Sequence, residues 1–253
     1  MGVPVEFISG KGPVFADSIC KNEELRLNSK GALKKLEYVF EATSLIKASI
    51  DVPLIGFTGS PWTLFVYLYY GESPKNHDEL NNYLKLKSHN THSYLEQITE
   101  TTKDYVHAQI EAGADCIQIF DSWGGLLDEK YQELSLNYIN QIAASVQVDI
   151  PIILYTRDKL IDNIIDLTPI KCFNLDTSDN IDNHISKSIT IQGNFNPQNF
   201  HADEEELKKT AELVYMKYKN KENYIFNLGS GLTPDINPEK VGYFLSQLSS
   251  FRS

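Results

Sequence analysis

Residues 113–125 read GADCIQIFDSWGG, and the run Asp115–Asp121 at the centre of this stretch indicates the fold class. The run is short, contains β-branched and aromatic residues, and does not alternate between apolar and polar side chains. Strands of this kind are covered on both faces, as in a parallel sheet. The stretch therefore predicts a buried strand whose carboxyl end presents Asp121 and Ser122.

Further runs with the same character occur along the chain: Pro53–Phe57, Ile150–Tyr155, Ile170–Leu175, Ser188–Gln192 and Tyr224–Leu228. Polar segments with helical periodicity separate them. Leu80–Gly113 is long enough for a pair of helices, and Asp128–Val146 and Glu204–Lys219 each predict one amphipathic helix. Strands that alternate with helices predict an α/β fold.

Helix starts are marked by capping residues. Ser60 precedes a proline, Asp203 precedes Glu206 by three positions, and Asn237 also precedes a proline. Residues 22–48 are also expected to be helical, whereas Val3–Ile8 is expected to form one arm of a hairpin.

The number of strands limits the architecture. A closed (β/α)8 barrel of the TIM type needs eight strands, and only six buried runs are found. The 253 residues contain no linker or repeat, so residues 1–253 are expected to form a single domain. Two alternatives remain: an open, doubly wound sheet, or a barrel that lacks its first two βα units.

Composition excludes several classes of protein. Apolar residues make up 42% of the chain and charged residues 23%, as in ordinary globular proteins. No apolar stretch approaches the ~20 residues of a membrane span, and the N-terminus does not resemble a signal peptide, so a cytoplasmic protein is expected. The net charge is −11, and the only arginines are Arg26, Arg157 and Arg252, which argues against nucleic-acid binding.

Metal and disulfide chemistry are not expected either. Cys20, Cys116 and Cys172 are widely spaced and odd in number, so we expect reduced thiols. His89, His92 and His107 occur on a predicted helix, but no carboxylate or cysteine completes a ligand set around them.

Polar and glycine-rich turns follow the predicted strands. Thr58-Gly59-Ser60 follows the first strand, Asp121-Ser122 the second, Gly193-Asn194 the fifth and Gly229-Ser230-Gly231 the last. Gly59 beside a helix start could bring backbone N–H groups to an anion, or could simply form a tight turn before a capped helix. The glycines at 229 and 231 permit backbone conformations closed to other residues. The carboxyl ends of strands are where α/β enzymes place their sites.

Taken together, these loops resemble the uroporphyrinogen decarboxylase family. The motifs that carry the resemblance are GFTGSPWTLFVY (56–67), GADCIQIFDSWGG (113–125), IQGNFNP (191–197) and IFNLGSGLTPDINPEKVG (225–242). They occur in the family's order, and the match runs from GKGPVF (10–15) to the last helix. The resemblance implies a (β/α)8 barrel, a homodimer, and removal of four acetate carboxyls from uroporphyrinogen III to give coproporphyrinogen III.

The resemblance also implies how the reaction proceeds and which residues bind the substrate. The family uses no metal or organic cofactor, and protonation of the substrate pyrrole provides the electron sink. Tyr67 and Ser122 match residues that contact substrate carboxylates. Ser230 stands where the family has a substrate-binding histidine between two glycines.

Residues expected at the catalytic centre do not occur in this sequence. The family carries an arginine-rich RQAGRY-type motif and an aspartate that binds the pyrrole nitrogens, and neither motif is present here. Catalytic residues are therefore unassigned, and Arg157 is not an expected replacement. The alternatives are a shortened piece of the decarboxylase, a non-catalytic binding or remnant protein, and a related zinc-dependent methyltransferase. The methyltransferase needs a His-x-Cys pair after the corresponding strand, whereas here the run Ile150–Tyr155 is followed by Thr156 and Arg157.

Overall fold

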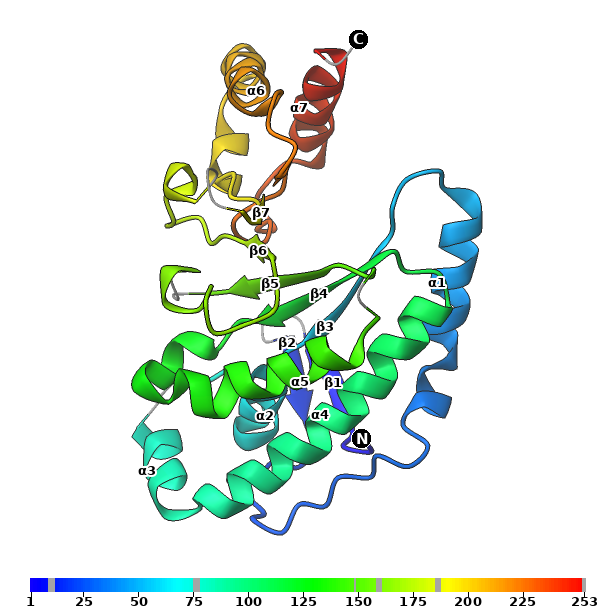
Figure 1. Ribbon diagram of the computed structural model, residues 1–253, viewed down its shortest axis with the longest axis vertical. Helices are drawn as coiled ribbons and strands as arrows, with labels where there is room; N and C mark the ends of the chain where they lie inside the picture. The colour runs from blue at the N-terminus through cyan, green and yellow to red at the C-terminus, as the bar shows by residue number, and fades with distance from the viewer. Residues whose placement is uncertain (9–11, 75–77, 148, 158–160, 185–187, 252–253) are drawn as a thin grey trace. The chain divides into compact units, whose positions relative to one another are not determined.

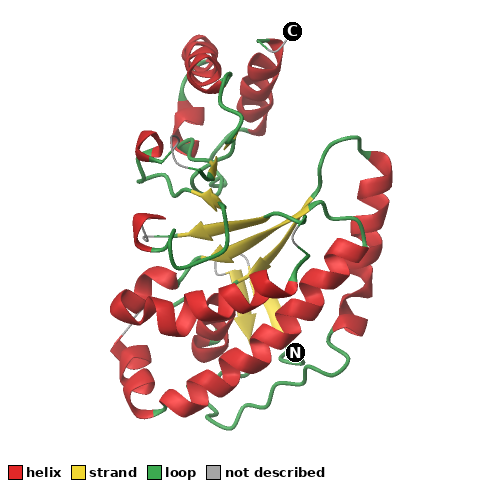
Figure 2. Ribbon diagram, in the orientation of Figure 1, coloured by secondary structure: helices red, strands yellow, loops and turns green. Residues whose placement is uncertain are grey.

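The structure is a computed structural model that describes residues 1–8, 12–74, 78–147, 149–157, 161–184 and 188–251. The chain divides into two compact units, Met1–Ile170 and Lys171–Ser253. Each unit contains parallel strands connected through helices (Figure 2). The predicted α/β class is therefore confirmed.

The first unit is built on three parallel strands, β3 (Ile55–Gly59), β4 (Cys116–Asp121) and β5 (Ile152–Thr156). Ile55 pairs with Cys116 and Ile117 pairs with Ile152, so the carboxyl ends of the strands lie at the same edge. Every residue of β5 is buried, as the uninterrupted apolar run predicted.

Helices of the first unit follow these strands in the expected order: α2 (Pro61–Tyr70), α3 (Asp78–Leu86), α4 (Ser88–Glu111) and α5 (Asn137–Ser145). The predicted pair of helices is α3 and α4. Figure 1 shows α4 and α5 side by side against the sheet, and both contact each other. The α2 helix is buried on most sides, with Trp62 and Phe65 fully buried.

The N-terminal segment forms the predicted hairpin. β1 (Val5–Ile8) pairs with β2 (Gly12–Phe15) in antiparallel register, while the turn at 9–11 lies outside the described residues. The end of the hairpin is bonded to the end of α2, because the Phe15 N–H donates to the carbonyl of Gly71 at 2.7 Å.

The helix expected over residues 22–48 is wrong in its first half. A short 3-10 turn (η1, Leu33–Leu36) leads into α1 (Glu37–Ser49), and residues 22–32 are irregular. Gly31 has φ +79°, which a helix does not accommodate. The backbone before it is bonded to α4 instead, since the Tyr94 hydroxyl donates to the carbonyl of Leu25 at 2.7 Å.

The helix predicted over Asp128–Val146 is also wrong in its first half. A 3-10 segment (η2, Gly124–Lys130) kinks at Asp128, where φ is 41°, and a π-helical turn (η3, Gln132–Leu136) precedes α5. The π turn contains Ser135, whose hydroxyl donates to the buried carboxylate of Asp121. The helix departs from the regular α-helical repeat at the turn that carries the hydrogen bond from Ser135 to Asp121.

The second unit contains β6 (Cys172–Asn174), β7 (Thr190–Gln192) and β8 (Tyr224–Ile225), which pair in parallel in that order. An isolated bridge between Phe195 and Leu228 continues the pairing of β7 with β8. Helices α6 (Glu204–Tyr218) and α7 (Pro238–Ser250) pack on each other around a core of Phe200, Leu207 and Phe244. Short 3-10 turns are η4 (Ile161–Asn163), η5 (Ile181–Asn183) and η6 (Pro197–His201).

Three predicted helix caps are confirmed. The side chain of Ser60 accepts from the N–H of Thr63, that of Asp203 from Glu206, and that of Asn237 from Glu239. No helix in the described part of the chain is long and apolar enough to cross a membrane.

The first and the last parallel strands along the chain, β3 and β8, expose apolar side chains. In β3, Ile55 is 39% exposed and Phe57 is 61% exposed, and in β8 Ile225 is 39% exposed. Among the described residues, β3 pairs only with β4, and β8 pairs only with β7. Both runs are therefore edge strands, as the count of six strands predicted.

Candidate functional site

The first set of candidate residues lies where β3 and β4 end. Asp121, the last residue of β4, is fully buried. The hydroxyl of Ser60, at the start of α2, donates to its Oδ1 at 2.6 Å, and the hydroxyl of Ser135 donates to its Oδ2 at 2.9 Å. The hydroxyl of Thr63 lies 3.5 Å from Oδ1. The strand end therefore carries a carboxylate surrounded by hydroxyl donors from two helical segments.

Burial sets the electrostatics of this cluster. Removal from water raises the pKa of Asp121, although the hydrogen bonds from Ser60, Ser135, Tyr131 and Thr63 act in the opposite direction. Burial beside the Asp121 carboxylate also raises the pKa of Tyr131. Gly124 is required here, because a Cβ at that position would overlap Asp121 Oδ2. Asp121 is thus an internal anchor, covered by its neighbours.

Tyr67 and Ser122, the two candidate substrate-binding residues of this unit, both lie next to Trp123. The Tyr67 ring meets the Trp123 ring edge to face, with 6.2 Å between centroids. Ser122 precedes Trp123 in the chain and is half-buried, and its hydroxyl has no hydrogen-bond partner among the described residues. Tyr69 is 5% exposed and serves packing.

Trp123 was missed as a functional candidate. Its backbone N–H donates to the hydroxyl of Thr63 at 3.3 Å, and its backbone carbonyl accepts from the indole N–H of Trp62 at 2.8 Å. The guanidinium of Arg157, just past β5, lies 5.6 Å from the centroid of the Trp123 ring. The sequence signal that could have identified Trp123 is its position, as an aromatic residue directly after Asp121 and Ser122.

The second set of candidates lies in the loops of the second unit. The side-chain amide of Asn194, after β7, donates to the carbonyls of Asp176 and Asp179, after β6, at 2.9 and 2.7 Å. The hydroxyl of Thr177 donates to that of Ser230, after β8, at 3.3 Å. The three loops that follow β6, β7 and β8 therefore lie together, and Thr177 is a neighbour of Ser230 that the sequence did not indicate.

The two glycines around Ser230 differ in their role. Neither has a positive φ, so the expectation that they supply special backbone conformations is wrong. A Cβ on Gly229 would lie 2.5 Å from the backbone nitrogen of Thr177, whereas a Cβ on Gly231 would meet nothing within 4 Å. Gly229 is thus required by the close approach of the loop after β6.

The remaining candidates serve structure. Ser60 caps α2, so the turn at Gly59 leads into a capped helix as expected. His92 contacts the Tyr138 hydroxyl at 2.7 Å and Glu133 at 3.1 Å, and His107 contacts the carbonyl of Ser145 at 2.8 Å. In the described part of the chain, no group of three or more His, Cys, Asp and Glu side chains could hold a metal ion. The three cysteines are free thiols.

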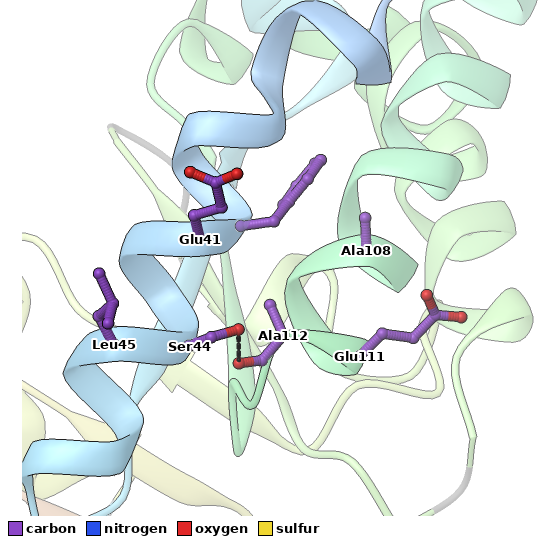
Figure 3. Close-up of a pocket in the computed structure, with 7 residues that line it drawn as sticks. Glu41, Ser44, Leu45, Ala108, Glu111 and Ala112 are labelled. Carbon is purple, nitrogen blue, oxygen red and sulfur yellow. Dashed lines mark hydrogen bonds between the residues drawn. The ribbon is translucent and has the colours of Figure 1, made fainter.

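A groove of about 630 Å³ lies on the surface between α1 and α4 (Figure 3). Glu41 and Glu111 flank it, and the Ser44 hydroxyl donates to the carbonyl of Ala112 at 3.0 Å across it. None of the described residues that line it is cationic. A polycarboxylate ligand would be repelled there, so this groove is not the candidate site.

The protein is an α/β protein in which polar side chains gather at the carboxyl ends of parallel strands. This arrangement is typical of α/β enzymes. The family model for uroporphyrinogen decarboxylase (URO-D) matches residues 1–251. The chain belongs to the uroporphyrinogen decarboxylase family.

Curated relatives agree with this assignment, and a solved structure shares the fold. The chain is 35% identical to uroporphyrinogen decarboxylase of Francisella philomiragia, over 99% of this chain and 76% of that protein. It is 32% identical to that of Hydrogenovibrio crunogenus, over 98% and 74%. A methyltransferase from Methanosarcina mazei superimposes with a TM-score of 0.75 at 17% identity, covering 100% of this chain and 77% of that chain. At that identity the likeness shows the fold alone.

Proposed function

We propose that this polypeptide takes part in the decarboxylation of uroporphyrinogen III to coproporphyrinogen III, within porphyrin and heme biosynthesis. The observation that carries the proposal is the family match over residues 1–251, together with 35% identity to a uroporphyrinogen decarboxylase in an alignment that covers 99% of the chain. The barrel architecture, a homodimeric assembly and a cytoplasmic location belong to the same proposal.

The chemistry needs fixed donors around the substrate's carboxylates, because loss of carbon dioxide follows protonation of a pyrrole ring. We propose Tyr67 and Ser122 as donors to substrate carboxylates. The hydroxyl of Ser122, which none of the described residues pairs with, and the contact between Tyr67 and Trp123 support this assignment. Ser230 is proposed as a further substrate contact; its hydroxyl is exposed and can donate one hydrogen bond. No cofactor or metal is part of the proposed reaction.

Residues 1–253 are proposed to hold only part of the catalytic machinery. The chain contains Arg26, Arg157 and Arg252 as its only arginines and has a net charge of −11, whereas the substrate carries eight carboxylates. An anaerobic assay with uroporphyrinogen III, with coproporphyrinogen as the readout, tests this directly. We expect no turnover from residues 1–253 alone. We expect turnover to appear when the part of the Francisella philomiragia relative that the chain does not cover is added.

A non-catalytic member of the family is the second candidate. Ser230 in place of the family histidine and the scarcity of arginine favour it. This candidate predicts tetrapyrrole binding without turnover, even after the complementing segment is added. Turnover by residues 1–253 at a rate near ~10 s⁻¹, an ordinary value for enzymes, would overturn the proposal that machinery is missing.

A further inference from the structure

Arg157 is placed where an anion could be bound. It directly follows β5, at the edge of the sheet where β4 ends in Asp121 and leads into Trp123, and its side chain is exposed. Of the two arginines that the structure describes, Arg26 lies instead in the irregular segment before α1, beside Glu23 and Glu24. Arg157 is therefore the arginine that the described part of the chain presents at a strand end.

The surface beneath Arg157 is fixed. Its guanidinium carbon lies 5.6 Å from the centre of the Trp123 ring, within the range of a cation–π contact. The Trp123 backbone is bonded on both sides, by Thr63 at 3.3 Å and by Trp62 at 2.8 Å. Its ring meets the Tyr67 ring in an edge-to-face contact. These contacts fix the Trp123 backbone and pack one ring against it, so the guanidinium rests on a surface whose position is largely set.

The hydrogen-bonding capacity of Arg157 is unused within the described residues. None of the described carboxylates forms an ion pair with it, although a guanidinium has five donors. A guanidinium that rests on an aromatic ring keeps its in-plane donors available. A carboxylate fits these donors with two parallel hydrogen bonds, which a lysine ammonium cannot match.

We propose that Arg157, held over Trp123, binds a carboxylate of the substrate, with Tyr67 contributing its hydroxyl from the same aromatic cluster. The ligand class is a planar carboxylate on a multiply carboxylated tetrapyrrole, so the inference rests on the proposed function. Arg157 then supplies, within residues 1–253, a cationic contact for a polyanion that the acidic chain would otherwise repel.

Binding titrations test this without any requirement for turnover. Residues 1–253 are titrated with uroporphyrin, the air-stable octacarboxylate, and separately with benzenehexacarboxylate, a polycarboxylate without a tetrapyrrole, using tryptophan fluorescence and calorimetry. Arg157→Gln is expected to weaken binding of both probes about tenfold, the effect of one lost charge-assisted hydrogen bond. Arg157→Lys is expected to weaken it about threefold, because the charge stays but the fork is lost. Arg26→Gln, which removes the same charge elsewhere, is expected to leave affinity unchanged.

The outcomes separate the two proposals. Equal uroporphyrin affinity for Arg157→Gln and the unmodified chain overturns the role of Arg157 and leaves the proposed function standing. Binding of benzenehexacarboxylate that depends on Arg157, without uroporphyrin binding, overturns the inference that this carboxylate site serves a tetrapyrrole. Binding of neither probe overturns the inference as a whole, whereas the proposed function is decided separately by the complementation assay with uroporphyrinogen III. An equal loss in Arg26→Gln would reduce the effect to net charge and also overturn the inference. If Arg157→Gln fails to fold, as judged by circular dichroism, the Arg157→Lys result decides.

Discussion

The hydroxyl of Ser60 donates a 2.6 Å hydrogen bond to the buried carboxylate of Asp121, 61 positions away in the sequence. The same Ser60 oxygen accepts from the N–H of Thr63 at 3.0 Å. One side chain thus joins the start of α2 to the end of β4. Since α2 carries Tyr67 and β4 leads into Ser122 and Trp123, this bond links both candidate substrate contacts of the first unit.

Replacing Asp121 by alanine is expected to destabilise the protein strongly. The hydroxyls of Ser60 and Ser135 would lose their acceptor inside a site that water does not reach. Each unsatisfied buried group costs about 1–3 kcal/mol, so we expect the free energy of unfolding to fall by about 2–5 kcal/mol. Urea unfolding followed by circular dichroism measures this. Asp104→Ala, which removes an exposed carboxylate on α4, is the matched control, and an equal loss in both variants would contradict the prediction.

The pH dependence of stability is expected to carry a contribution from Asp121. Burial raises the pKa of this carboxyl in the folded state above the ordinary value of 3.8. The folded state therefore binds the proton more tightly than the unfolded state. Its stabilising contribution is complete below the unfolded pKa and is lost as pH rises through the raised folded pKa.

Asp121→Asn removes this titration and retains a polar group of similar shape. As the pH rises from 4, the unfolding free energy of the unmodified chain is expected to fall relative to that of this variant. A difference that stays constant over that range would show that the carboxyl is charged throughout and that the hydroxyl donors outweigh burial.

The sequence predicts the alternation of strands and helices because buried parallel strands are continuous apolar runs. Caps such as Ser60 and Asp203 were predictable because they act on N–H groups two or three residues away. The start of α1 and the π turn before α5 were not predictable, because they depend on contacts distant in sequence. Ser135 adjusts to Asp121, and the segment before α1 is bonded to Tyr94.

The candidate site shows the same division. Polar residues after the strands were visible in the sequence, since the carboxyl ends of parallel strands meet at one edge. The contact of Arg157 with Trp123 and that of Thr177 with Ser230 each join two loops. No periodicity or local motif encodes contacts of this kind. The requirement for glycine at position 229 could not be predicted either, because it arises from the close approach of the Thr177 backbone, 52 positions away in the sequence.

Gly229→Ala is expected to destabilise the second unit, whereas Gly231→Ala is expected to be nearly neutral. A methyl group at 229 would press on the backbone of Thr177, while one at 231 meets open space. Overpacking against backbone costs about 1–3 kcal/mol, and an exposed substitution without contacts changes stability by less than about 0.5 kcal/mol. Urea unfolding of the two variants provides the comparison, and equal midpoints would show that the loop after β6 moves freely away.

Tyr67→Phe is expected to weaken uroporphyrin binding without a loss of stability. The ring contact with Trp123 is retained, and only the hydroxyl is removed. One neutral hydrogen bond contributes about 1 kcal/mol, so affinity should fall about fivefold. Tyr38→Phe is the control, because that ring is 67% exposed on α1. A loss of affinity in both variants, or in neither, would contradict the role proposed for Tyr67.

Hydrogen exchange is expected to distinguish the edge strands from β5. Amides of Pro53–Phe57 and Tyr224–Leu228 should exchange faster than those of Ile150–Tyr155, because β3 and β8 are edge strands and every residue of β5 itself is buried. Exposed Phe57 and Ile225 should also make residues 1–253 poorly soluble by themselves. Equal protection of all three runs in a soluble monomer would contradict the proposal that a barrel is incomplete here.

One amide at the edge of β3 is expected to be an exception. The side chain of Gln109, on α4, accepts from the N–H of Phe57 at 3.0 Å and donates to the carbonyl of Phe57 at 3.1 Å. Gln109 is only 3% exposed, so this pair of bonds is shielded from water. The amide therefore satisfies both backbone groups of one edge residue, as a neighbouring strand would. The Phe57 N–H should exchange more slowly than its neighbours in β3.

Gln109→Leu fills a similar volume but removes both hydrogen bonds. We expect the Phe57 amide to exchange as fast as the other edge amides in this variant, with little change in Ile153 or Leu154 of β5. The unfolding free energy should fall by about 2–4 kcal/mol, because two backbone groups lose their partners. Gln97→Leu is the matched control, since Gln97 is exposed on the same helix and, among the described residues, its side-chain amide bonds only to the carbonyl of Ser93, at 3.1 Å. If Phe57 stays protected in Gln109→Leu, its N–H must be paired with another strand, and β3 would then not be an edge.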